Sequence, residues 1–169
     1  FIKNCISSNT IDINFLNKFD AVLILAGLVG DPITKKHTKL SILYNEEYII
    51  NFIKKCSNSK ITKLIFISTC SNYGFIKNNF IADENFPLNP LSIYAKSKVK
   101  IENYLSQNIK KHDFQTTILR FATAFGISPR MRFDLTISHF TKDAYLNKAL
   151  KIFDGNTWRP YCHVNDFSK

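Results

Sequence analysis

The sequence predicts an α/β protein with a doubly wound parallel sheet. Short apolar runs of strand length alternate along the chain with longer stretches in which apolar residues recur at helical spacing. Runs that are apolar throughout are typical of strands buried on both faces of a parallel sheet. Strands separated by helices of this length imply crossover connections, so the strands should run in parallel.

The elements are predicted in alternating order. The expected strands are Ala21–Ala26, Lys63–Ser68 and Thr116–Phe121, and the expected helices are 39–57 and 92–111. Leu40, Leu43, Tyr44, Ile50 and Ile53 form the apolar stripe predicted for the first helix. After Gly126 the rhythm changes. There the sequence predicts a loop over 128–132, a helix over 133–148, a short strand over 151–153 and a helix beginning near Val164. We therefore expect one region over 1–125 and the beginning of another over 126–169.

Composition narrows the classes of protein. The 169 residues are 45% hydrophobic and 21% charged, as in ordinary globular proteins. The sequence has no signal-peptide core and no apolar run of the roughly 18 residues that a membrane span needs, so we expect a cytoplasmic protein without membrane contact. The net charge of +10 comes from lysines scattered singly and in pairs, which does not favour a nucleic-acid partner.

Cysteine and histidine spacing gives no sign of a metal. The four cysteines stand far apart without a C-x-x-C pair, and we expect them to be reduced thiols. The four histidines show no spacing typical of metal ligands. No metal site is predicted.

Tyr94 and Lys98 are the first candidates for chemistry. They stand four residues apart on a predicted helix and therefore share a face. A free phenol titrates near 10, and a nearby ammonium favours the phenolate. The pair is thus a candidate general acid/base. The spacing alone is weak evidence, because Tyr73 and Lys77 repeat it, although they follow a strand in a loop that fixes no geometry.

Hydroxyl groups directly follow the second predicted strand. Ser68 ends this strand and Thr69 follows it, at the position where parallel α/β sheets bind their ligands. The Thr69 hydroxyl can both donate and accept a hydrogen bond. A hydroxyl after one strand and Tyr-x-x-x-Lys on the next helix is the arrangement of the short-chain dehydrogenase/reductase superfamily.

The amino-acid sequence of five segments resembles the extended branch of that superfamily, the NAD(P)-dependent epimerase/dehydratase family. The segments are Asp20–Gly27, Ser68–Gly74, Pro87–Tyr94, Leu119–Gly126 and Trp158–Asp166. They are similar, in order, to a strand ending in small residues and to S-T-x-x-V-Y-G, P-x-x-P-x-x-x-Y, L-R-x-x-N-x-Y-G and R-x-Y-x-H-V-x-D. The resemblance implies a Rossmann-like domain over 1–125 that binds NAD or NADP, followed by the start of a substrate-binding region.

The resemblance also implies roles for individual residues. Tyr94 would move the proton of a sugar hydroxyl, Lys98 would hold the cofactor ribose and assist Tyr94, and Thr69 would bind the reacting oxygen. The cofactor would contact Leu25, Ala26, Gly27, Ser68, Tyr94 and Lys98. The nucleotide-diphosphate sugar would contact Thr69, Cys70, Ser71, Thr123 and Arg159. Arg159 is suited to diphosphate because a guanidinium forks onto phosphate oxygens; a surface arginine beside Trp158 is the alternative.

The sequence departs from the family pattern at several places. The Gly-rich phosphate loop is absent, and Gly27 and Gly30 are followed by Asp31 and Pro32, which do not suit a pyrophosphate. We therefore expect the loop to lie outside this sequence, and the isolated chain to bind cofactor weakly and to be inactive. Thr123 replaces the family's usual Asn.

Two more departures bear on the reaction. Asn72 replaces an apolar residue. Cys70 and Ser71 stand where sugar dehydratases carry Asp-Glu, so dehydration is disfavoured. The Cys70 thiol could take part in acid/base chemistry, but packing is the commoner role of such a cysteine.

The leading hypothesis is an NAD(P)-dependent nucleotide-sugar epimerase. A reductase or dehydrogenase acting on a nucleotide sugar is the alternative within enzymes, and a non-catalytic binding protein of the same fold is the alternative outside them. By resemblance we also expect a homodimer formed through the helices 39–57 and 92–111. The sugar, the nucleotide and the choice between NAD and NADP cannot be read from these residues.

Overall fold

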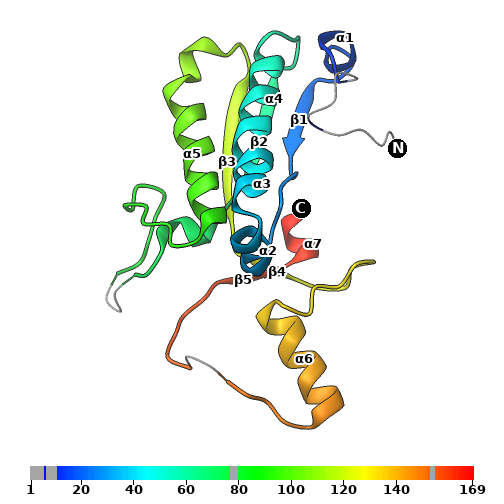
Figure 1. Cartoon of the computed structure of the whole chain (residues 1–169). Coiled ribbons are helices and arrows are strands. Elements are labelled where there is room, and N and C mark those ends of the chain that lie inside the picture. Colours follow the sequence, from blue (N-terminus) through cyan, green and yellow to red (C-terminus); the bar gives the residue numbers. More distant parts are fainter. Residues whose placement is uncertain (1–5, 7–10, 77–79, 153–154) are drawn as a thin grey trace. The chain divides into compact units, whose positions relative to one another are not determined.

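A computed structural model describes residues 6, 11–76, 80–152 and 155–169 (Figure 1). The chain forms two compact units, residues 1–120 and 121–169. No helix in the described part of the chain is long and apolar enough to cross a lipid bilayer.

The first unit is built on a sheet of three strands. In sheet order these are β1 (Ala21–Ile24), β2 (Lys63–Thr69) and β3 (Gln115–Phe121). β1 and β2 pair in parallel, with Ala21 opposite Lys63 and Ile24 opposite Phe66. The predicted α/β class, its parallel pairing and the three strands of this sheet are confirmed, although β1 ends two residues earlier than expected.

Burial of the strands corrects the sequence prediction. β1 was expected to be buried on both faces, but only Ile24 is buried, and Leu23 is 51% exposed. In the described sheet β1 pairs on one side only, which leaves this strand at an edge. In β2 burial alternates: Leu64, Phe66 and Ser68 are buried, and the residues between them are half-buried.

The helical stretch predicted over 39–57 consists of three consecutive segments. They are α3 (Thr38–Ile42), the π-helical turn η1 (Leu43–Glu47) and α4 (Tyr48–Ser57). Two short helices were not predicted, α1 (Ile13–Leu16) and α2 (Asp31–Lys36). The predicted apolar stripe is wrong in its first half, because Leu40 and Tyr44 are exposed. The buried positions there are polar: Ser41, Asn45 and Glu46.

Helix α5 (Ile93–Gln107) begins where the sequence predicted. The hydroxyl of Ser92 accepts a hydrogen bond from the Ala95 amide at 3.1 Å and so caps the helix. A short 3₁₀ turn, η3 (Ile109–Lys111), follows, so the predicted helix to Lys111 ends four residues early as an α-helix. Figure 1 shows α4 and α5 side by side along the sheet. The core between them and the sheet contains Ile24, Ile53, Leu64, Phe66, Ile101 and Leu105.

The described residues of the second unit form four elements. They are β4 (Thr123–Phe125), α6 (Thr136–Asn147), β5 (Tyr161–His163) and α7 (Val164–Phe167). β4 and β5 pair in parallel with Thr123 opposite Tyr161, and neither strand was predicted. The predicted strand over 151–153 is wrong for Lys151 and Ile152, which lie outside any strand, and Phe153 lies outside the described residues. No residue in the described part of 121–169 is buried.

Candidate active site

The carboxyl end of β2 passes directly into a 3₁₀ turn, η2 (Cys70–Tyr73). Thr69 is in extended conformation and caps this turn, because its Oγ1 accepts a hydrogen bond from the Ser71 amide at 3.2 Å. Thr69, Cys70 and Ser71 are all half-buried. The Thr69 hydroxyl proton remains available to a ligand, since this bond uses the oxygen only as an acceptor.

Lys98 is held inside the protein at the same end of β2. Lys98 is only 5% exposed, and its Nζ donates a hydrogen bond to the carbonyl oxygen of Ile67 at 2.7 Å. The ammonium lies 4.5 Å from the ring centre of Phe66 and 5.5 Å from that of Tyr94. The two residues predicted as a pair therefore lie together on the first turns of α5, with Lys98 against the strand.

Burial changes the charge balance at Lys98. Desolvation lowers the pKa of its ammonium from 10.5 to about 8, and the negative charge of Glu102 opposes this change. At neutral pH Lys98 is still mostly protonated. A positive charge in this desolvated position acts on its neighbours through a low dielectric, more strongly than it would in water.

The loop that leads to Tyr94 is fixed to the end of β2. The Asn89 amide donates to the Asn72 carbonyl oxygen at 2.9 Å. Gly74 has a φ of 68°, and a Cβ at this position would lie 2.0 Å from the Asn89 carbonyl oxygen. Only glycine fits such a conformation and such an approach. These contacts hold the Pro87–Tyr94 approach close to the turn after Thr69.

The loop after β1 is held by a residue that sequence reasoning missed. Asn45, in the π-helical turn, accepts from the Leu28 amide at 2.7 Å and donates to the Leu28 carbonyl oxygen at 2.9 Å. A Cβ on Gly27 would approach Asn45 Oδ1 to 3.1 Å, which explains a residue without a side chain there. No sequence pattern identifies Asn45, because its partner Leu28 lies 17 residues earlier in the loop after β1.

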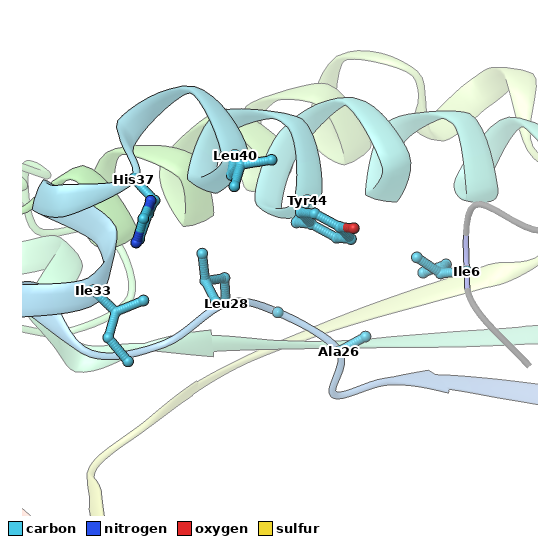
Figure 2. Close-up of a pocket in the computed structure, with 8 residues that line it drawn as sticks. Ile6, Ala26, Leu28, Ile33, His37, Leu40 and Tyr44 are labelled. Carbon is cyan, nitrogen blue, oxygen red and sulfur yellow. The ribbon is translucent and has the colours of Figure 1, made fainter. Parts of the chain in front are cut away.

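A pocket of about 410 Å³ opens beside this loop (Figure 2). It is lined by Ile6, Ala26, Gly27, Leu28, Ile33, His37, Leu40 and Tyr44. Figure 2 shows His37, Leu40 and Tyr44 reaching from the helical side toward Leu28 and Ala26 of the loop. Among the predicted cofactor contacts, Ala26 and Gly27 lie at this pocket, and Leu25 is exposed directly before them.

Ser68 lies apart from that pocket, at the end of β2. It is buried, and its hydroxyl donates to Glu102 Oε1 at 2.5 Å. Since its side chain is occupied in this way, a contact between Ser68 and a cofactor would involve the main chain. The partners of Glu102 were not predicted from the sequence, although Glu102 stands four residues after Lys98 on the same helical face.

The second unit brings together two residues predicted to bind substrate. Arg159 is exposed, and its Nε donates to Thr123 Oγ1 at 2.8 Å across the β4–β5 pair. This bond orients the guanidinium and leaves its terminal N–H groups for an anion. Thr123, which the sequence predicted to bind substrate, thus also accepts a hydrogen bond that holds Arg159.

The described residues contain no cluster of His, Cys, Asp and Glu that could bind a metal ion. Two cysteines within the described ranges, Cys56 and Cys162, are free thiols. Burial raises the pKa of Cys56 to about 12, so this thiol is not a nucleophile.

Comparison with known proteins agrees with this arrangement. A sequence profile of the NAD dependent epimerase/dehydratase family matches residues 5–169. An uncharacterized UDP-glucose epimerase, YtcB, of Bacillus subtilis is 30% identical over 158 residues, which are 92% of this chain and 49% of that protein. The ADP-L-glycero-D-manno-heptose-6-epimerase of Brachyspira hyodysenteriae is 30% identical over 128 residues, 72% of this chain and 40% of that protein.

A solved structure shows the same fold. The UDP-glucuronic acid 4-epimerase of Bacillus cereus, in complex with UDP-glucuronic acid and NAD, is 29% identical with a TM-score of 0.84. The match covers 99% of this chain and 52% of that one. The chain belongs to the NAD-dependent epimerase/dehydratase family, an enzyme family with a Rossmann-like fold. It spans about half the length of the curated relatives it matches.

Proposed function

We propose that this chain is part of an NAD(P)-dependent nucleotide-sugar epimerase. The observation that carries the proposal is Lys98, buried at the end of β2 with Tyr94 beside it on the same helix. A lysine is rarely buried without a reason, because desolvating its charge is costly. Relatives named as epimerases of UDP- or ADP-linked sugars support the same activity.

The proton-transfer residues have separate tasks in this proposal. Tyr94 takes the proton from a sugar hydroxyl and later returns it, and the Lys98 charge stabilises the phenolate in between. The Thr69 hydroxyl donates to the reacting oxygen. Cys70 and Ser71 line the turn beside it, and neither supplies the acid/base pair that dehydration would need.

The chain's residues also fit a dinucleotide. Leu25, Ala26, Gly27 and the main chain at Ser68 would hold NAD or NADP, and Tyr94 and Lys98 would face its ribose. The small Gly27 turn clamped by Asn45, with the apolar pocket beside it, is the observation that supports this fit. When bound, the cofactor would accept a hydride from the sugar and give it back.

Arg159 is assigned to the diphosphate of the nucleotide sugar. Its N–H groups other than Nε match phosphate oxygens, and Thr123 sets its direction. In this proposal residues 1–125 are the remainder of the dinucleotide-binding domain and 126–169 begin the substrate-binding region. Because the chain spans about half the length of its curated relatives, we expect it to be inactive by itself.

A homodimer is proposed on the family resemblance. The outer side of α4 and α5 carries a groove of about 510 Å³, lined by residues that include Ile50, Val99 and Tyr104. A second copy would cover this groove through the same two helices, as two-fold symmetry requires.

The test uses the whole protein with a panel of UDP-sugars and added NAD. We expect NMR to show inversion of configuration at one sugar carbon. The absorbance of reduced nicotinamide should not rise during turnover. Tyr94→Phe should lower kcat by roughly 10²–10⁴-fold, the size of a lost general acid/base. Tyr145→Phe is the matched control, because Tyr145 is an exposed tyrosine on α6 to which the proposal assigns no role.

Two results would favour the alternatives. Steady formation of reduced cofactor would replace the epimerase with a reductase or dehydrogenase. Unchanged turnover in Tyr94→Phe would remove the catalytic role of Tyr94 altogether, and ligand binding without any turnover would indicate a non-catalytic binding protein.

A further inference from the structure

Beneath the end of β2 lies a cluster of hydrogen-bonded polar side chains that the proposed mechanism does not use. It consists of Ser68, Asn72, Glu102 and Arg120, and we call it the polar anchor. Ser68, Asn72 and Glu102 are almost completely buried, and Arg120 is largely covered. Burying a polar group destabilises the fold unless that group is hydrogen-bonded, so each hydrogen bond in the cluster offsets part of this cost.

Glu102 is the centre of the polar anchor. Its Oε1 accepts from Ser68 Oγ at 2.5 Å and from Asn72 Nδ2 at 2.7 Å, and its Oε2 accepts from a terminal nitrogen of Arg120 at 2.8 Å. Arg120 Nε lies within 3.2 Å of both oxygens. One cation and two neutral donors therefore satisfy this buried carboxylate.

The orientation of the Asn72 amide follows from its neighbours. Its Nδ2 also donates to Ser68 Oγ at 2.9 Å, and the opposite orientation would place an amide oxygen against the carboxylate. In the observed orientation Asn72 Oδ1 is buried without a hydrogen-bond donor among the described residues. An unsatisfied buried acceptor destabilises the folded chain. The family pattern has an apolar residue here, which would avoid that cost.

Asn72 joins three segments that surround the candidate site. Its side chain binds Ser68 at the end of β2 and Glu102 on α5, and its carbonyl oxygen accepts from Asn89 in the loop before Tyr94. Ser68 directly precedes Thr69. The position of the Thr69 hydroxyl therefore depends on the bonds of Asn72.

Glu102 connects the polar anchor to Lys98. Glu102 follows Lys98 by one helical turn on the same face of α5. Lys98 donates a hydrogen bond to the Ile67 carbonyl oxygen, and Glu102 accepts one from the neighbouring Ser68. Two consecutive turns of α5 are thus hydrogen-bonded to two consecutive residues of β2. The charged or titratable groups facing this cluster are Lys98 from α5, Arg120 from β3 and Tyr73, whose hydroxyl accepts from Arg120 at 3.0 Å.

We propose that Asn72 and Glu102 are positioning residues for the proton-transfer site: Asn72 fixes the end of β2 against α5, and Glu102 keeps Lys98 positively charged. The catalytic consequence rests on the proposed function, whereas the effect on Lys98 does not. The sign of the effect is set by charge. A carboxylate near a buried ammonium favours the protonated lysine, so removing it should let Lys98 lose its proton at lower pH.

The first test measures the titration of Lys98 directly. The whole protein is labelled with [¹³C]lysine, and the Lys98 signal is assigned as the one absent from the spectrum of Lys98→Met. We expect its midpoint near pH 8 in the unchanged protein. In Glu102→Gln the midpoint should fall by roughly one pH unit. An unchanged midpoint in Glu102→Gln would overturn the role of Glu102.

Glu46→Gln is the matched control for this titration. Glu46 is also a buried carboxylate that contacts α5, but its oxygens accept from Ser97 and Lys100. This variant should leave the Lys98 midpoint in place. Should Glu102→Gln fail to fold because Arg120 is left unpaired, the double variant Glu102→Gln/Arg120→Met removes both charges together. A smaller fall in the Lys98 midpoint is expected there, because the double variant also removes the Arg120 cation, whose charge disfavours a protonated Lys98.

The second test concerns Asn72. Asn72→Leu keeps the approximate size of the side chain and removes its hydrogen bonds. We expect kcat to fall roughly tenfold, the equivalent of one hydrogen bond, with KM unchanged. Equal kcat in the folded variant, or a rise in KM alone, would overturn the role of Asn72.

The two tests separate this proposal from the proposed function. The Lys98 titration needs no turnover, so it decides the role of Glu102 even if the protein proves not to be an epimerase. Conversely, an active epimerase whose Lys98 midpoint ignores Glu102 would refute the polar anchor and leave the proposed function in place.

Discussion

The two compact units differ in how far their functional polar side chains are exposed to solvent. In residues 1–120 the functional candidates Ser68 and Lys98 are buried, and each has a hydrogen-bond partner. In the described part of 121–169 nothing is buried, and Arg159 meets Thr123 at the surface. The same types of group, a cation and a hydroxyl, thus occur in two different dielectric environments.

This difference separates two kinds of task. A charge that must change the reactivity of a neighbour acts most strongly where water is excluded. A charge that must capture a diphosphate from solution acts at an exposed position, where its N–H groups are accessible. We therefore expect changes in the first unit to affect kcat, and changes in the second unit to affect KM.

The largest expected effect concerns stability. Leu105 is buried completely in the core of the first unit, whereas Leu146 on α6 is 62% exposed. Leu105→Ala should lower the free energy of unfolding by about 2–5 kcal/mol through lost packing and the cavity it leaves. Leu146→Ala should change it by less than about 0.5 kcal/mol. Urea unfolding of the two variants measures both values, and equal losses would contradict the contrast in burial.

A smaller effect is expected at Arg159. Arg159→Ala removes the guanidinium that we propose binds the diphosphate, and this should raise KM roughly tenfold to a hundredfold and leave kcat nearly unchanged. Arg130→Ala is a suitable control, because Arg130 is an exposed arginine of the same unit. Steady-state kinetics with the accepted sugar nucleotide checks the prediction. A decrease confined to kcat would mean that Arg159 acts in the reaction step. It would contradict the expectation that changes in the second unit affect KM.

Much of the fold was predictable because local patterns determine it. The sheet strands of the first unit follow from their apolar runs, and the start of α5 follows from the serine before it, since Ser92 caps the helix. The adjacency of Tyr94 and Lys98 follows from helical geometry alone. The predicted roles of the site residues, in contrast, stay predictions.

The remaining features depend on contacts between distant segments. The stripe containing Leu40 and Tyr44 was wrong because polar Asn45 and Glu46 take the buried positions, where Leu28, Ser97 and Lys100 supply their partners. The pairing of β4 with β5 joins segments 36 residues or more apart in the sequence, and three-residue strands carry little pattern. Glu102 reads as an ordinary surface residue until its partners on β2 and β3 are known.

Lys98 also predicts how activity and stability respond to pH. Its pKa in the folded chain, about 8, lies below the 10.5 of a free lysine because of burial. Between these values the unfolded chain binds more protons than the folded chain, so Lys98 makes stability rise with pH across this window. In the proposed mechanism turnover needs the charged form of Lys98, so kcat should fall over the same window. Activity and stability should therefore move in opposite directions as pH rises from about 8.

The most direct test of the claim that Lys98 supports proton transfer by Tyr94 is kcat of the whole protein as a function of pH. We predict a decline of about tenfold for each pH unit above about 8, while circular dichroism shows that the protein remains folded. A kcat that stays constant to pH 10 in the folded protein would contradict the account, because the ammonium it depends on would by then be gone.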